Sequence, residues 1–60
     1  MDIQMIRQNL KQTIKNKEEF FQKLQGQTGL VAETTAHFLL INIDELKKIL
    51  KDVETVIAAG

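Results

Sequence analysis

Cysteine, proline, tryptophan and tyrosine are all absent from this 60-residue chain, which contains one histidine and three glycines. The lack of cysteine excludes disulfides and thiolate metal sites, and a single histidine excludes a histidine-rich metal cluster. We therefore expect no cofactor and no metal. A chain of this length buries only about 60% of the surface that its unfolded form exposes, so its monomer would be marginally stable. Self-association is the remaining way to stabilise it.

Net charge is lacking as well, because eight basic and eight acidic residues cancel. This balance argues against binding to nucleic acid or to an anionic membrane by bulk charge. Long hydrophobic runs are also missing, since the longest extends only from Ala36 to Ile41 and is interrupted by His37. A bilayer requires about 20 apolar residues, so we expect a soluble, cytoplasmic protein with no membrane partner.

Helical periodicity is the main feature that the chain does contain. Apolar residues in the first half recur at steps of three and four, which is typical of one stripe on an amphipathic helix. This stripe consists of Ile3, Ile6, Leu10, Ile14, Phe21 and Leu24. The only turn signal is at residues 26–29, where a glycine suits the left-handed residue that ends a helix and Thr28 can cap the next one. The sequence predicts one helical-hairpin domain over residues 1–60, with helices at about 2–25 and 30–58.

The second half carries two apolar rows at helical spacing. The first row is a seam whose alternating steps of four and three continue over more than three heptads. This seam consists of Ala32, Ala36, Leu39, Ile43, Leu46, Leu50, Val53 and Ile57. A second row, formed by Val31, Phe38, Ile49 and Val56, lies about 80–100° away around the helix. The two rows together are wider than one helix–helix contact requires.

Residues 37–43 also fit a β-strand, because they are rich in β-branched and aromatic side chains. A strand there would need a partner from another chain, since the sequence offers no second strand candidate. We favour the helix, so the predicted fold is all-α: an antiparallel two-helix hairpin that assembles as a dimeric four-helix bundle. With the turn near Gln27, residues whose numbers sum to about 54 should face each other across a short connection.

Candidate partner-binding residues occupy the second helix. Ile41 falls opposite the seam, on the polar face beside His37 and Leu40, so these three residues form a candidate docking patch for another protein. With the second row included, the predicted partner-binding residues are His37, Phe38, Leu40, Ile41, Ile49 and Val56. The chain has no Gly-rich phosphate loop, nucleophile–base set or metal motif, so we do not expect an enzyme.

We therefore predict a small protein–protein interaction module: an adaptor, regulator or inhibitor of a larger protein, which acts through helix packing. Its expected partners are a second copy of itself, in a homodimer or higher oligomer, and another protein. Short, uncharged, cysteine-free hairpins of this kind suit accessory genes of bacteria, mobile elements or phages. A purely structural oligomerisation module is a further alternative.

Nucleic-acid binding is the other alternative. Arg7, Lys11 and Lys15 are spaced four apart and line one edge of the first helix. In layout, the predicted dimer of hairpins resembles the Rop-like RNA-binding proteins, and this resemblance implies that paired basic rows could follow a phosphate backbone. The zero net charge opposes this function, and only Phe20 and Phe21 could stack on bases.

Overall fold

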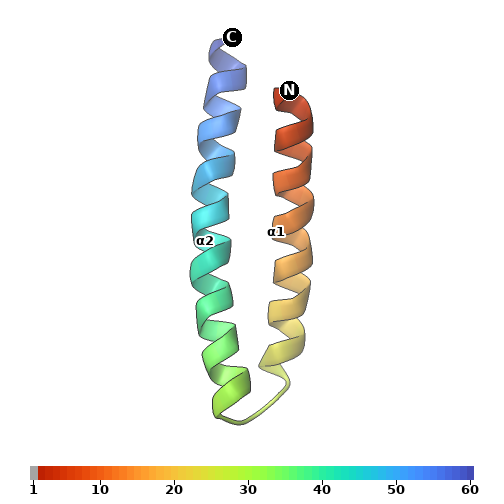
Figure 1. Cartoon of the computed structure of the whole chain (residues 1–60), viewed down its shortest axis with the longest axis vertical. Helices are drawn as coiled ribbons and strands as arrows, with labels where there is room; N and C mark the ends of the chain where they lie inside the picture. The colour runs from red at the N-terminus through yellow and green to blue at the C-terminus, as the bar shows by residue number, and fades with distance from the viewer. Residues whose placement is uncertain (1) are drawn as a thin grey trace.

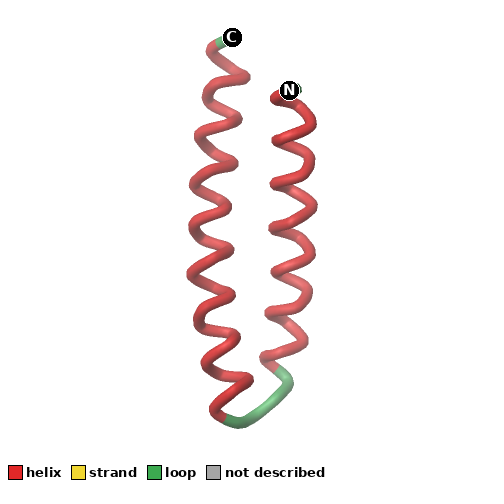
Figure 2. Tube along the Cα trace, in the orientation of Figure 1, coloured by secondary structure: helices red, strands yellow, loops and turns green. Residues whose placement is uncertain are grey.

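A computed structural model describes residues 2–60 as two helices joined by a short loop. Helix α1 spans Ile3–Gln25 and helix α2 spans Leu30–Ala59. The helices lie side by side and run antiparallel, so both termini are at the same end (Figure 1). Figure 2 shows no strand in this part of the chain, and residues 37–43 are helical. The predicted all-α hairpin is confirmed, and the strand alternative is wrong.

Helix α1 begins at a side-chain cap. Asp2 has an extended backbone, and its Oδ1 accepts a hydrogen bond from the Gln4 N–H at 2.9 Å. This bond satisfies one of the donors that the first helical turn leaves unpaired. From there the helix continues for 23 residues, because no glycine interrupts it and its Gln, Lys, Glu and Leu residues all favour helix.

The loop has its positive φ at the glycine that precedes α2 and not at the glycine that ends α1. Gly26 ends α1 in the right-handed region, at φ −81° and ψ −3°, and its N–H donates to carbonyl oxygens in the last turn. The positive φ is found at Gly29, which precedes α2 at φ 117° and ψ 159° and supplies no side-chain cap. The expected left-handed end of the first helix and the Thr28 cap are both wrong, because Gly29 lies between Thr28 and the helix.

The core is the line of contact between the predicted stripe and the predicted seam. Every residue of both sets is buried or half-buried. Within residues 2–60, the buried hydrophobic residues are Ile14, Leu24 and Ile43, and the least exposed of them is Ile43 at 3%. Burial of one such side chain contributes about 1.5–3 kcal/mol relative to exposure. The periodicity therefore identified the inner face of each helix, but that face forms only a thin core.

Two ion pairs show how the helices are aligned. Arg7 Nε lies 3.4 Å from Glu54 Oε2, and Lys47 Nζ lies 3.2 Å from Glu18 Oε2. The paired residue numbers sum to 61 and 65, whereas the sequence suggested about 54. At a rise of about 1.5 Å per residue, a sum of 54 would separate Glu18 and Lys47 by about 16 Å along the axis, which is beyond their reach.

The predicted pairing across the hairpin is therefore wrong by more than one helical turn. Figure 1 shows the reason, since α2 starts beyond the end of α1 and not level with it. The loop of residues 26–29, with its positive φ at Gly29, joins the last turn of α1 to this lower start of α2.

Candidate interaction surface

Both ion pairs lie on the same side of the hairpin. At about 100° per residue, Arg7 and Glu18 fall to one side of the α1 stripe. Glu54 and Lys47 fall to one side of the α2 seam in the same way. Because each pair joins α1 to α2, these two sides face in one direction, which we call the ion-paired flank. The four side chains are between 35% and 53% exposed, so each pair contributes at most about 1 kcal/mol.

The second apolar row of α2 lies on the opposite side of the seam. We call Val31, Phe38, Ile49 and Val56 the apolar row. All four side chains are exposed, from 47% at Ile49 to 80% at Val31. At 100° per residue, Phe20 of α1 turns towards the same side, and it is half exposed.

Exposed polar residues, namely Asn9, Thr13 and Asn16, share this flank of α1 with Phe20. Lys17 and Lys23 lie three residues before and after Phe20 and border it on the helix surface. The hairpin therefore has one flank that carries both interhelix ion pairs and one flank that carries the exposed apolar row. This division is the main asymmetry of the molecular surface.

His37 and Ile41 of the docking patch lie on the outer surface of α2, away from α1, and Leu40 lies at the edge of that surface on the side of Lys47. Leu40 and Ile41 are 45% and 46% exposed, and His37 is exposed beside them. The His37 ring meets the Phe38 ring edge-on, with centroids 5.9 Å apart and planes at 64°. Phe38 therefore links the docking patch to the apolar row, and all six predicted partner-binding residues are at the surface of one helix.

We call Arg7, Lys11 and Lys15 the basic row, and the fold separates Arg7 from the two lysines. Arg7 is half-buried, and its Nη1 donates to Gln4 Oε1 at 3.3 Å while its Nε faces Glu54. Among residues 2–60 this Nε has no hydrogen-bond partner, so its approach to Glu54 is a charge contact and not an aligned hydrogen bond. Lys11 and Lys15 are exposed. The structure thus joins Arg7 to α2 and leaves the two lysines in solvent.

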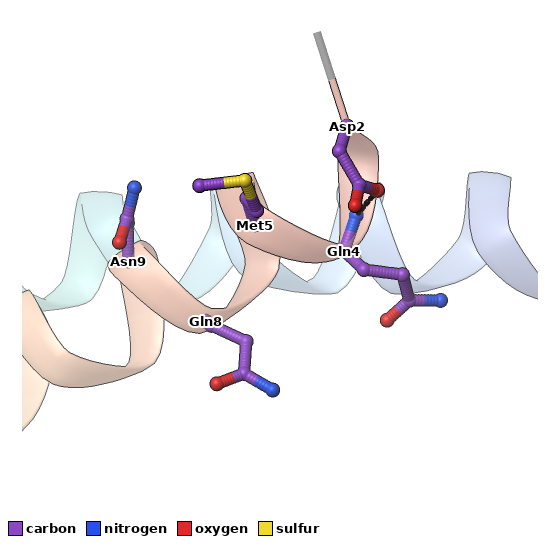
Figure 3. Close-up of a pocket in the computed structure, with 5 residues that line it drawn as sticks. All are labelled: Asp2, Gln4, Met5, Gln8 and Asn9. Atoms are coloured by element: carbon purple, nitrogen blue, oxygen red, sulfur yellow. Dashed lines mark hydrogen bonds between the residues drawn. The ribbon is translucent and has the colours of Figure 1, made fainter.

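One surface depression, of about 400 Å³, lies at the start of α1 (Figure 3). It is lined by Asp2, Gln4, Met5, Gln8 and Asn9. Figure 3 shows these side chains spreading away from one another, apart from the capping bond between Asp2 and Gln4. Ligand sites normally surround most of the ligand with converging groups, and this depression is built from only one end of one helix.

Two further features of the described residues concern metals and membranes. No group of three or more His, Asp or Glu side chains in residues 2–60 is placed to hold a metal ion. Neither α1 nor α2 is long and apolar enough to cross a membrane.

The chain matches no protein-family model, and comparisons with curated proteins and with solved structures also give no match. Its function must therefore be argued from its own surface. Sequence reasoning had not grouped Phe20 with the apolar row, or recognised the ion-paired flank. The available signal was the opposite charge of Glu18 and Lys47, each beside a row that faces the other helix.

Proposed function

We propose that this chain is a non-enzymatic protein–protein interaction module, an adaptor, regulator or inhibitor of a larger protein, that acts through helix packing. We also propose that it assembles as a dimeric four-helix bundle. The observation that carries both proposals is the distribution of apolar side chains on α2. Only three hydrophobic residues are buried within residues 2–60, whereas large exposed hydrophobic side chains extend around α2 from the apolar row to the docking patch.

The exposed area supports association with another polypeptide. The hairpin exposes 4750 Å², whereas a globular monomer of its mass exposes roughly 4000 Å². The excess is therefore roughly 750 Å², and a protein–protein interface of standard size buries about 800 Å² on each partner. One interface of ordinary size would bring the chain to the exposure expected of a compact protein.

The positions of the apolar row and the docking patch support a separate contact for each of these two surfaces. The apolar row borders the seam, so a second hairpin that covers it extends the existing core. His37, Leu40 and Ile41 point away from that core and remain accessible when the row is covered. We therefore assign the docking patch to the larger protein, which would receive it as a helix in a hydrophobic groove.

A capture experiment tests the docking patch. The tagged wild-type chain and the double variant Leu40→Asp/Ile41→Asp are used as baits in the cells that produce the protein. Gln8→Asp/Gln12→Asp is the matched control, because it adds two carboxylates on the exposed side of α1. We expect one partner at a fixed ratio to the wild-type and control baits, and a loss of roughly tenfold or more with the double variant, because aspartates would have to be desolvated in the groove.

Quantitative mass spectrometry of the captured proteins gives these ratios. Capture that is unaffected by Leu40→Asp/Ile41→Asp, or the absence of any partner at a fixed ratio, would overturn the assignment. Circular dichroism checks that all three baits have the same helix content.

A further inference from the structure

The apolar row has internal symmetry along α2. Its four members are separated by steps of seven, eleven and seven residues. The spacing of the row is therefore the same in both directions from a point between Ile43 and Asp44. Rotation of a second α2 by 180° about that point would place Val31 opposite Val56, and Phe38 opposite Ile49.

We infer that the apolar row binds the same row of a second copy of this chain, antiparallel, about a two-fold axis that lies between the two α2 helices and is level with the midpoint between Ile43 and Asp44. The inference deepens the proposed four-helix bundle and rests on it. It specifies which flank is covered, which helices meet and which residues oppose each other. A two-fold interface must use the same patch on both copies, and a symmetric row meets this condition without any change of shape.

The positions of the carboxylates favour this arrangement over a parallel one. In the antiparallel pairing, Glu45 lies opposite Asn42 of the second copy, and Asp52 lies opposite Thr35. A parallel, in-register pairing would place Glu45 opposite Glu45 and Asp52 opposite Asp52, and like charges at such positions destabilise a helix pair.

The flanks of the hairpin also favour the antiparallel contact between the two α2 helices. A two-fold axis along the helices would place the apolar row of each copy against α1 of the other, where Phe20 is apolar but Asn9, Thr13 and Asn16 are polar. The inferred axis instead brings α2 against α2 and apolar groups against apolar groups. The ion-paired flank remains in solvent, so Glu18 and Lys47 keep their hydration.

Distances between spin labels test the inferred axis, because the natural chain has no cysteine and single cysteines can be labelled specifically. Asp44→Cys and Ala58→Cys both carry the label on exposed positions outside the apolar row. In the antiparallel dimer the two labels at position 58 are about 40 Å apart along the axis of the α2 helices. The two labels at position 44 are only about 2 Å apart in that direction. We therefore expect a much longer pulsed-dipolar distance for Ala58→Cys than for Asp44→Cys.

A dimer in which both labels give similar distances would overturn the antiparallel axis, although the four-helix bundle itself would stand. A chain that sedimentation equilibrium shows to be monomeric at high micromolar concentration would overturn the axis and the bundle together. The assignment of the docking patch would then still be decided by the capture experiment.

Two isoleucine variants test the flank. Ile49 and Ile41 are 47% and 46% exposed on the same helix, but only Ile49 belongs to the apolar row. We expect Ile49→Gln to raise the dimer dissociation constant by roughly tenfold or more, because each dimer loses two buried isoleucines. Ile41→Gln should leave it within roughly twofold. Equal effects of the two variants would overturn the choice of flank.

Discussion

The position of a side chain around α2 decides its contribution to stability more than its chemical type does. Ile41 and Ile43 are two residues apart and chemically identical, yet they are 46% and 3% exposed. Two residues correspond to about 200° around a helix, so the two side chains point in nearly opposite directions. Ile43 packs in the core and Ile41 meets solvent.

These two residues provide a prediction at the residue scale. Ile43→Ala should lower the free energy of unfolding by about 2–5 kcal/mol, because it removes buried methyl groups and leaves a cavity. Ile41→Ala should change it by less than about 0.5 kcal/mol. Urea unfolding, followed by circular dichroism at one protein concentration, measures both. Similar losses for the two variants would contradict the burial pattern of α2.

At the scale of the elements, the loop determines how the two helices are aligned. Gly26 has ordinary right-handed angles, and a Cβ added there would meet only the Lys23 carbonyl oxygen at 3.7 Å. Gly29 has space around it, but its φ of 117° is one that residues with a side chain rarely adopt. The two glycines therefore have different roles, although the sequence marks both simply as turn residues.

Alanine substitutions should separate these roles. Gly29→Ala should destabilise the hairpin by about 1–3 kcal/mol, because alanine is strained at this φ and ψ. Gly26→Ala should stabilise it by about 0.4–1 kcal/mol, because alanine reduces the freedom of the unfolded chain without strain in the folded one. Thermal and urea unfolding test both. A stabilising Gly29→Ala would show that the chain reverses elsewhere.

At the scale of the whole molecule, shape and charge limit the partners that the hairpin can attract. The molecule measures 47 × 15 × 14 Å, so nearly every residue lies near a surface. Its eight basic and eight acidic residues give no net field. The basic row is also reduced by the fold, because Arg7 is paired with Glu54. These facts favour recognition by apolar contact over long-range steering.

RNA binding provides the test at this scale. We expect no saturable binding of a fluorescent RNA hairpin at physiological salt, and only weak binding at low salt, measured by anisotropy. Lys11→Gln/Lys15→Gln should leave that weak signal nearly unchanged, because two lysines contribute little without a net positive charge. Tight binding that falls steeply with salt and with this variant would instead support the Rop-like alternative.

The sequence by itself determined the two helices, the inner face of each and the exposure of the apolar row and docking patch. These features depend on the repeat of apolar side chains around one helix, which is independent of any other segment. The alignment of the helices was decided only by the tertiary structure, because the same repeat tolerates a shift of one helix along the other. The backbone angles of Gly29 and the contact between Glu18 and Lys47 select one alignment. That alignment brings Arg7 level with Glu54 and Glu18 level with Lys47, because side chains on two helices can pair only when the fold holds them at the same height.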